Sequence, residues 1–338
     1  MKCLITDSQE IDSLKIEERP APGTPGACEV LVEVKAVSLN YRDILAASGQ
    51  YGAKPALPFI VGSDMAGKVL EVGKEVSDLK PGDRVLNAPF KFWPAGKLKS
   101  SWAKTFIGAN GVDGVLCQQV LYPASSLVKV PEHLSYVEAS TLPIAGLTAW
   151  SAVVTHGHTR PGDWILLQGT GGVSIFAAQI AEKLGARTIM TTSNAEKSRL
   201  VKEKFGVHAT LDYRDAGWAE KVRALAEGQG VHLVVEVAGD SLAESIRSCR
   251  SYGRVALIGI LGGAESNVNV VDIFRRQITV RGIYMESAQE LQDLARAMEA
   301  WGLKPCVDKV FSFEESKDAY KYVKAQKHIG KVVVSLGE

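Results

Sequence analysis

Apolar and polar positions in the middle of the chain follow the pattern of a strand, a tight turn, a helix and a second strand. Residues 164–168 form a short apolar run, which is typical of a buried parallel strand. Residues 173–184 are apolar on most faces and are closed by Gly185, which predicts a helix with a glycine just past its end. Residues 187–192 have the pattern of a second strand, so this stretch forms one strand-helix-strand unit.

Helices and short apolar strands continue to alternate after this unit. The same pattern predicts strands over residues 209–213, 232–237, 254–259 and 278–284. Because strands that alternate with helices pair in parallel, this part should form a parallel sheet covered by helices on both faces. The predicted fold class is therefore α/β, with a doubly wound parallel sheet.

The first third of the chain has the two-residue period of strands. Every second residue of 29–35 is a valine, and residues 58–73 and 116–122 predict further strands. Residues 88–114 interrupt this pattern, and we expect a structured loop that packs its aromatic side chains over the cleft. These are Phe90, Phe92, Trp93, Trp102 and Phe106.

The end of the chain returns to a mixture of helix and strand. Residues 288–301 have the period of an amphipathic helix. Residues 306–313 and 331–336 predict strands, with a helix over residues 314–325 between them.

Composition and charge exclude several classes of protein. The chain has 338 residues, 46% hydrophobic and 23% charged, with a net charge of +1, which suits one large domain or two ordinary ones. No basic patch suggests a nucleic-acid partner, and no apolar stretch is long enough to predict a membrane span. Five dispersed cysteines without a Cys-x-x-Cys pair fit a reducing compartment, so we expect a cytoplasmic protein.

The glycine-rich turn after the first central strand has the chemistry of an anion site. It consists of Gly169, Thr170, Gly171, Gly172 and Val173. Glycine lets a phosphate approach the backbone, and the helix start offers free N–H groups and a positive dipole end. Because a strand precedes the turn and a helix follows, we expect it to bind a dinucleotide. The alternative is a glycine-rich turn in an unrelated sheet.

Ser174 takes the third glycine position, so we expect slightly looser packing of the helix on the strand.

The end of the second central strand indicates which nicotinamide cofactor is favoured. NAD sites usually place an acidic residue about 20 residues after the glycines, where it holds the ribose 2′-hydroxyl. Residues 191–194 contain no acid, and Ser193 is followed by Lys197 and Arg199. Hydroxyls and cations suit a 2′-phosphate, so we expect NADPH in preference to NADH. The alternative is that Lys197 and Arg199 lie on a solvated helix face.

Four stretches together resemble the medium-chain dehydrogenase/reductase superfamily over essentially the whole chain. They are Asn-Tyr-Arg-Asp at 40–43, Gly-Ser-Asp at 62–64 with Gly67, Ala-Gly-Leu-Thr-Ala-Trp at 145–150, and Gly-Thr-Gly-Gly-Val-Ser at 169–174. The chain looks most similar to the zinc-free branch of quinone oxidoreductases and alcohol-dehydrogenase-like proteins.

The resemblance implies two domains and an assembly. Residues 1–145 and 288–338 would form a GroES-like, β-rich catalytic domain, and residues 146–287 a Rossmann dinucleotide-binding domain. A homodimer is also implied, in which residues 278–284 pair edge to edge across the interface.

The departures from the zinc-containing members predict that no metal is bound. Those members have Cys where this chain has Asn40, His where it has Ser63, and Cys near Ile144. A catalytic zinc needs about three ligands from Cys, His or carboxylate, which Asp64 alone does not supply. The structural zinc lobe of those enzymes has four closely spaced cysteines, whereas residues 88–114 contain none. We therefore expect no zinc at either site.

Hydride transfer without a metal requires hydrogen-bond donors for the charge that develops on the acceptor oxygen. Tyr41 is the candidate donor, because a phenol can give a hydrogen bond and then a proton; alternatively, it packs against the nicotinamide. By resemblance, Asn40 faces the substrate or only holds its loop. Thr148 resembles the threonine of the family that contacts the nicotinamide half; alternatively, its hydroxyl only bonds the backbone of its own helix. We expect Asp43 to orient its loop and Arg42 to be a surface charge.

Four further residues are candidates for cofactor contacts. Tyr213 ends a strand where zinc-free members place an aromatic side chain near the adenosine phosphate, although such a tyrosine can also be there for packing. Gly239 and Gly259 follow the next two strands, at the carboxyl edge where α/β sheets bind ligands. Lys331 resembles a basic residue of the tail that reaches the cofactor in some relatives.

Taken together, these features predict a metal-independent, NADPH-dependent oxidoreductase that reduces a conjugated carbonyl substrate. The substrate would be a quinone, reduced by electron transfer, or an enone, reduced by hydride addition. A zinc-free, NADP-dependent alcohol dehydrogenase or aldehyde reductase is the alternative within this class. A non-catalytic NADPH-binding protein is the alternative from another class.

Overall fold

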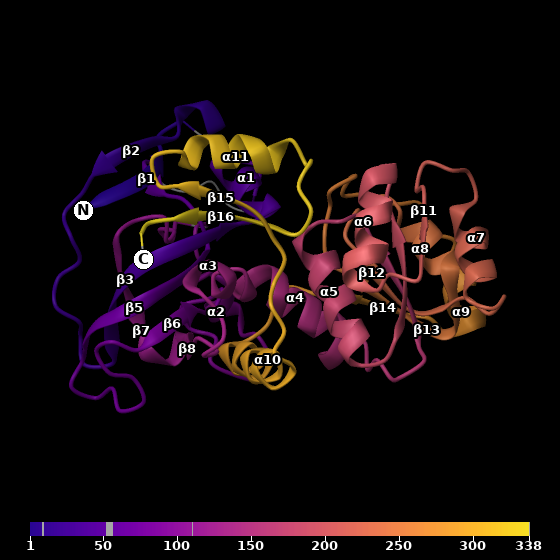
Figure 1. Ribbon diagram of the computed structural model, residues 1–338, viewed down its shortest axis with the longest axis horizontal. Helices are drawn as coiled ribbons and strands as arrows, with labels where there is room; N and C mark the ends of the chain where they lie inside the picture. The colour runs from indigo at the N-terminus through magenta and orange to yellow at the C-terminus, as the bar shows by residue number, and fades with distance from the viewer. Residues whose placement is uncertain (9, 52–56, 110, 338) are drawn as a thin grey trace. The chain divides into compact units, whose positions relative to one another are not determined.

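The computed structural model describes residues 1–8, 10–51, 57–109 and 111–337 (Figure 1). The chain forms two compact units, a β-rich unit of Met1–Leu147 with Glu286–Glu338, and an α/β unit of Thr148–Met285. The boundaries expected from the sequence, after residue 145 and before residue 288, each lie two residues from these.

The α/β unit contains a six-stranded parallel sheet. Its strands, in spatial order, are β11 (Ala209–Leu211), β10 (Arg187–Thr191), β9 (Trp164–Gln168), β12 (Val231–Glu236), β13 (Cys249–Leu257) and β14 (Thr279–Gly282). Counted along the chain within this unit, the order is 3-2-1-4-5-6, which is that of a doubly wound dinucleotide-binding sheet. The predicted fold class is confirmed, although β13 begins five residues before the predicted residue 254. The strand order reverses between β9 and β12.

Helices cover this sheet in two groups. One group is α5 (Gly172–Lys183) and α6 (Ala195–Phe205), which contact each other and the strands β9 to β11. The other is α7 (Trp218–Leu225), α8 (Leu242–Ser248) and α9 (Val270–Arg276), of which α8 packs on β12 and β13. Right-handed crossovers place the two groups on opposite faces of the sheet. Leu166, Ile189, Val234 and Val255 are buried within the sheet.

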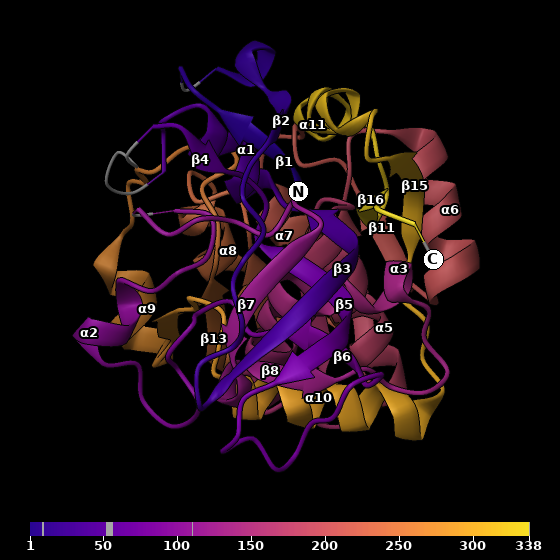
Figure 2. The same ribbon diagram turned by 90° about the vertical axis from the view of Figure 1, so that its left-hand side faces the viewer.

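The β-rich unit is built around one long strand. β3 (Glu29–Leu39) is antiparallel to β5 (Asp64–Val72), β7 (Gln119–Pro123) and β16 (Lys331–Ser335). β6 (Arg84–Asn87) and β8 (Leu127–Lys129) extend the sheet beyond β5, and β15 (Val307–Ser312) extends it beyond β16 (Figure 2). A smaller sheet has the order β2 (Lys15–Glu18), β1 (Lys2–Thr6) and β4 (Phe59–Ile60).

Short helices join these strands. They are η1 (Ile11–Ser13), α1 (Tyr41–Ala47), α2 (Ser100–Ala103), η2 (Ala124–Ser126), α3 (Tyr136–Ala139) and η3 (Leu142–Gly146). α4 (Leu147–Trp150) and η4 (Ser151–Thr155) lead into the α/β unit, and α10 (Ala288–Trp301) and α11 (Ser316–Lys324) complete the β-rich unit. The predicted helix over residues 288–301 is confirmed by α10. None of the described helices combines the length and the apolar character needed to cross a bilayer.

In the aromatic segment over residues 88–114, three of the aromatic rings pack against one another. Phe90 and Phe106 form an isolated strand bridge, and their rings stack with centroids 4.8 Å apart. The ring of Trp93 meets that of Phe90 edge-on, at 5.3 Å between centroids. These three side chains are buried, whereas Phe92 is half exposed and Trp102 is partly exposed. Three of the five aromatic residues are thus buried, and their expected packing over a cleft stays a prediction.

The edge of the α/β sheet is formed by β14. Among the described strands, β14 pairs only with β13, so its second edge is open within this chain. Phe274, in the helix before β14, is 63% exposed. The homodimer expected through this edge stays a prediction.

Candidate functional site

The turn between β9 and α5 has an open backbone. Gly169 has a φ of +67°, which side chains other than glycine rarely adopt. A Cβ added at Gly169 or Gly171 would meet no atom within 4 Å. Gly171 precedes the first helical residue and supplies no side-chain cap, so the N–H groups of the first turn remain for another acceptor. Thr170 and Val173 lie in the same turn, and the arrangement suits a phosphate group.

Ser174 links the helix to the strand at the third glycine position. The side chain is buried, and its Oγ donates a hydrogen bond of 2.5 Å to the carbonyl oxygen of Gln168. A hydrogen bond therefore takes the place of the close contact that a glycine would allow.

A buried polar cluster joins the ends of β9 and β12, where the strand order reverses. Gln168 Nε2 donates to Glu236 Oε2 at 2.8 Å, and Gln168 Oε1 accepts from the N–H of Val237 at 3.1 Å. Glu236 is fully buried and also accepts from the hydroxyls of Ser241 and Ser245. Neither Gln168 nor Glu236 was assigned a role from the sequence alone. The sequence feature that could have indicated them is a polar residue at the end of each of two apolar strands.

Two predicted glycines lie at the same edge of the sheet. Gly239 has a φ of +85°, and its N–H donates to Glu236 Oε1 at 2.9 Å. A Cβ at Gly239 would come within 2.3 Å of the carbonyl oxygen of Gly263. A Cβ at Gly259 would come within 2.4 Å of the carbonyl oxygen of Val237. Both positions therefore require glycine for close backbone approach, and contact with a cofactor stays a prediction.

Three residues meet beyond the carboxyl ends of β10 and β11. Ser193 Oγ donates to the hydroxyl oxygen of Tyr213 at 3.2 Å, and Arg214 Nη2 donates to the carbonyl oxygen of Ser193 at 3.2 Å. Arg214 also donates hydrogen bonds to both carboxylate oxygens of Asp212 and lowers the pKa of that carboxyl to about 2. Arg214 was not predicted from the sequence, although its position directly after Tyr213 could have indicated it.

The two cations predicted on α6 differ in their surroundings. The N–H of Lys197 donates to Asn194 Oδ1 at 2.9 Å, which places Lys197 in the first turn of the helix, near Ser193 in the chain. Arg199 pairs with Glu203 one turn later, and its side chain is 62% exposed. For Arg199, the solvated helix face is thus the observed arrangement.

In the β-rich unit, Asn40 lies between two buried charges. Lys331 Nζ donates to Asn40 Oδ1 and, at 2.7 Å, to the carbonyl oxygen of Leu39. Asn40 Nδ2 donates to Asp64 Oδ2 at 2.8 Å. The Asn40 amide therefore bridges an ammonium and a carboxylate whose nearest atoms are 3.9 Å apart. The side chains of Lys331 and Asp64 are 3% and 0% exposed.

The residues around Asn40 correct one expectation. Arg42 is not a surface charge, because its side chain is only 8% exposed. Its Nη1 donates to Asp43 Oδ1 at 3.1 Å and to the carbonyl oxygen of Ile107 at 2.8 Å. A buried guanidinium is tolerated when its donors find such partners. Asp43 also accepts from the backbone N–H of Asn40 at 2.9 Å and from the hydroxyl of Ser63, so it does hold its loop.

The remaining two predicted residues are Tyr41 and Thr148. Tyr41 is the first residue of α1 and is partly exposed. Its hydroxyl makes no hydrogen bond within the described residues, so it is available as a donor. Thr148 is buried in α4, at the start of the α/β unit.

The residues at the positions of the zinc ligands do not suit a zinc ion. Asn40 offers an amide, Ser63 a hydroxyl, and Ile144 no donor at all. The Lys331 ammonium, bonded to Asn40, would repel a second cation. Within the described ranges, no group of three or more His, Cys, Asp or Glu side chains could hold a metal ion.

The buried carboxyl of Asp64 has an unusual affinity for protons. Burial raises the pKa of Asp64 to about 7, against the opposing influence of the Lys331 ammonium, and the charge of Asp43 adds to the rise. Burial also lowers the pKa of Lys331. Asp64 Oδ1 has no hydrogen-bond partner among the described residues, so a proton can reside there.

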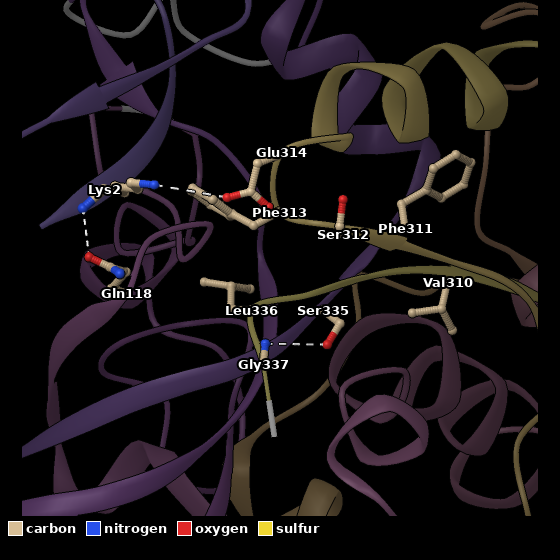
Figure 3. A pocket seen from close by; sticks show the side chains of 10 residues that line it. All are labelled: Lys2, Gln118, Val310, Phe311, Ser312, Phe313, Glu314, Ser335, Leu336 and Gly337. Carbon is tan, nitrogen blue, oxygen red and sulfur yellow. Dashed lines mark hydrogen bonds and ion pairs between the residues drawn. The ribbon is translucent and has the colours of Figure 1, made fainter.

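A separate pocket of about 480 Å³ lies in the β-rich unit, beside β15 and β16 (Figure 3). Lys2 and Glu314 both line it and form an ion pair at 3.9 Å. None of the predicted site residues lines this pocket, so we assign it no part in the chemistry.

The raised pKa of Asp64 predicts a pH-dependent stability. Between about pH 4 and pH 7 the folded protein holds a proton that the unfolded chain releases, so the free energy of unfolding should fall as the pH rises. The Asp64→Asn variant lacks this contribution, which amounts to at most about 4 kcal/mol over the interval. Urea unfolding at several pH values measures it, with the exposed Asp78→Asn as control. If the free energy of unfolding changes with pH equally in the wild type and the Asp64 variant, the raised pKa of Asp64 is refuted.

Comparison with known proteins agrees with the two-unit architecture. Residues 26–132 match the family described as "Alcohol dehydrogenase GroES-like domain", and residues 172–300 match the family described as "Zinc-binding dehydrogenase". A Schizosaccharomyces pombe protein described as zinc-type alcohol dehydrogenase-like is 36% identical over 333 residues, 96% of each chain.

Solved structures share the fold over the whole chain. An NAD-dependent alcohol dehydrogenase is 31% identical, with a TM-score of 0.89 and coverage of 100% of both chains. A mycobacterial protein solved in complex with NADPH is 27% identical, with a TM-score of 0.82 and coverage of 99% of both chains. With the strand order of the α/β sheet, these matches show that the chain is an oxidoreductase of the medium-chain dehydrogenase/reductase superfamily.

Proposed function

We propose that this oxidoreductase works without a metal and uses NADPH to reduce a conjugated carbonyl substrate, a quinone or an enone. The observation that carries the proposal is the hydrogen-bonded group of Lys331, Asn40 and Asp64. Asn40 stands where zinc-containing members have a ligand, and its amide is already engaged at both ends. At the position where those members hold a zinc ion, the positive charge is therefore that of the Lys331 side chain.

The α/β unit would hold the cofactor through its backbone and a few side chains. The open turn over residues 169–173 suits the diphosphate. Gly239 and Gly259 let the backbone pack closely at the same edge of the sheet and are further candidates for contacts with the cofactor. Ser193, Lys197 and Tyr213 would bind the 2′-phosphate by hydrogen bonds and charge. Bound NADPH supplies the hydride. The similar structures include both an NAD-dependent enzyme and an NADPH complex. The preference for NADPH over NADH is therefore argued from the residues of this chain.

The β-rich unit would supply the donor for the acceptor oxygen. The Tyr41 hydroxyl has no hydrogen-bond partner among the described residues. The carboxylate of Asp43 accepts a hydrogen bond from the backbone N–H of Asn40, the residue before Tyr41. Asn40 is held in turn by Lys331 and Asp64. The backbone that carries Tyr41 is thereby fixed, which is what precise donation to a developing oxyanion requires. Thr148 and Lys331 are further candidates for contacts with the cofactor.

The names of the relatives support a second candidate function. Both the Schizosaccharomyces pombe protein and the NAD-dependent enzyme are described as alcohol dehydrogenases or similar to them. A zinc-free, NADP-dependent alcohol dehydrogenase or aldehyde reductase would use the same groups, with Tyr41 donating to an aldehyde oxygen.

A panel of acceptors separates the candidate functions. Purified protein, with its metal content measured on the same sample, is mixed with NADPH and an ortho-quinone, an enone or an aldehyde, and with NADP and an alcohol. Turnover of quinone or enone by metal-free protein is the expected result. Turnover of aldehyde or alcohol alone would favour the dehydrogenase, and tight NADPH binding without turnover would indicate a non-catalytic protein.

Cofactor preference is measured by fluorescence titration with NADPH and NADH. We expect NADPH to bind at least about tenfold more tightly, because one charge-assisted hydrogen bond to the 2′-phosphate is worth about 1.5–3 kcal/mol. Lys197→Ala should weaken NADPH about tenfold and leave NADH nearly unchanged. Lys204→Ala, at an exposed position of the same helix, serves as control. Equal or tighter binding of NADH by the wild type would contradict the assignment of Ser193 and Lys197.

The proton donor is tested by the Tyr41→Phe variant. Loss of the hydroxyl should lower kcat about 100-fold or more, the usual contribution of a positioned acid, while the Kd for NADPH stays the same. Tyr136→Phe, which removes a hydroxyl elsewhere in the β-rich unit, should turn over at the wild-type rate. An unchanged kcat in the Tyr41 variant would remove this residue as proton donor.

A further inference from the structure

Two buried cysteines face each other across an antiparallel bridge. Cys3 lies in β1, and Cys117 lies on the segment beside it. The N–H of Leu4 donates to the carbonyl oxygen of Leu116 at 2.8 Å, and the N–H of Gln118 donates to that of Lys2 at 3.1 Å. These bonds flank the cysteines on both sides, so the two form a non-hydrogen-bonded pair. In such pairs the Cα atoms lie about 4.5 Å apart and the side chains are at their closest.

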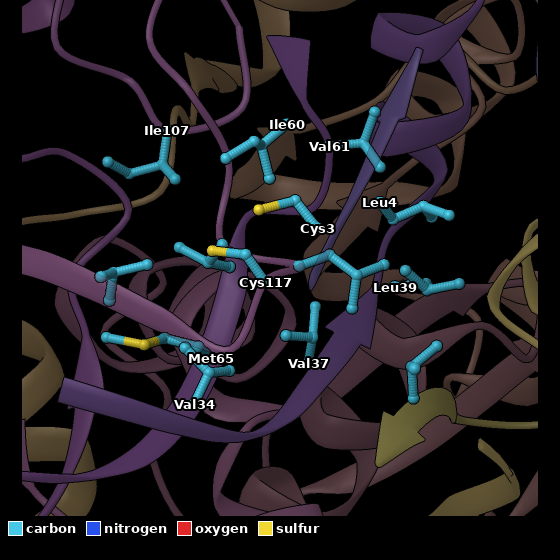
Figure 4. Close-up of a cluster of buried hydrophobic side chains, with 14 of the residues drawn as sticks. Cys3, Leu4, Val34, Val37, Leu39, Ile60, Val61, Met65, Ile107 and Cys117 are labelled. Atoms are coloured by element: carbon cyan, nitrogen blue, oxygen red, sulfur yellow. The ribbon is translucent and has the colours of Figure 1, made fainter. Parts of the chain in front are cut away.

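This separation is compatible with a disulfide. Disulfides join residues whose Cα atoms lie about 4.4–6.8 Å apart, so the pair sits at the short end of the range. Bonds formed away from the preferred separation are strained and more easily reduced. Both sulfurs lie in one apolar cluster, where the two side chains are 0% and 1% exposed (Figure 4). The structure holds both cysteines as free thiols.

The two thiols differ in reactivity. Each thiol donates a hydrogen bond to a backbone carbonyl oxygen, Cys3 to that of Met1 and Cys117 to that of Gln119. The neighbouring Cys117 lowers the pKa of Cys3, and the charge of Arg19 also contributes. Cys3 in turn raises the pKa of Cys117, and burial adds to the rise. Cys3 is therefore the better nucleophile, and Cys117 is placed to react with it afterwards. By contrast, the hydrogen bond to Glu75 raises the pKa of the exposed Cys28.

We propose that Cys3 and Cys117 form an oxidisable dithiol site, which hydrogen peroxide converts reversibly into an intramolecular disulfide. The Cys3 thiolate attacks one peroxide oxygen, the O–O bond breaks, and a sulfenic acid and one water result. The Cys117 sulfur then attacks the Cys3 sulfur, and the hydroxyl leaves as a second water. Two thiols lose two electrons in total, and one peroxide is reduced to two waters.

The site lies next to the segment that carries Ser63 and Asp64. The carbonyl oxygen of Leu4 accepts from the N–H of Val61 at 3.1 Å, and the N–H of Leu116 donates to the carbonyl oxygen of Val61 at 3.0 Å. Val61 is thus held between the two strands that the disulfide would join. The bond would also close the long loop from residue 3 to residue 117, which restricts the unfolded chain. We expect oxidation to raise the melting temperature by several degrees.

Peptide mapping of the native protein tests the proposal. Reduced protein is exposed to hydrogen peroxide, quenched in acid, alkylated and digested with trypsin without reduction. We expect a linked pair of the peptides that contain Cys3 and Cys117, two hydrogens lighter than their sum, which disappears when dithiothreitol is added first. In Cys117→Ala, dimedone should instead label Cys3 as the trapped sulfenic acid. The Cys28→Ala variant should form the linked pair as the wild type does.

Two results would overturn the proposal. One is that Cys3 and Cys117 both remain open to alkylation after hours in millimolar peroxide. The other is that the linked pair appears only in protein unfolded by guanidinium, which would show that the native geometry does not support the bond. Neither readout depends on catalytic activity or on NADPH.

Discussion

A lysine and an aspartate buried in the β-rich unit need each other, and much of the candidate site depends on this pair. When both groups are charged, removing either one leaves the other buried without compensation, which costs about 3–5 kcal/mol in comparable cases. Lys331 comes from β16 and Asp64 from β5, and the Asn40 amide between them aligns its oxygen with the cation and its N–H with the anion. The chain around Tyr41 is therefore fixed by electrostatics as well as by packing.

The α/β unit uses neutral and charged polar groups for a similar purpose. Gln168 and Glu236 end two neighbouring strands, and their hydrogen bonds hold the backbone after each strand in place. Because the strand order reverses between these strands, the cluster lies at the place where sheets of this kind bind ligands. Fully satisfied polar clusters of this sort make the backbone rigid, and a rigid turn can present its N–H groups to a phosphate without reorganisation.

The parts that the sequence predicted well depend on local patterns. The helical period of residues 288–301 predicts α10, and the glycines within residues 169–172 predict the open turn. Both features depend on residues that are close in the chain. The burial of Arg42 could not be predicted in this way, since its acceptor on Ile107 lies 65 residues away. The bridge from Asn40 to Lys331 spans 291 residues, and the pairing of Cys3 with Cys117 likewise needs the folded sheet. A sequence shows which side chains are polar but not which partners they meet.

The strand that carries Lys331 also has a consequence for biosynthesis. The α/β unit is one continuous stretch, so all of it has left the ribosome while the last strand of the β-rich unit is still being made. Until β16 emerges, β3 lacks one neighbour in its sheet, and Asp64 has no lysine to balance its charge. The inserted unit can therefore fold before the unit that surrounds it, which reverses the usual order from the N-terminus in multidomain chains.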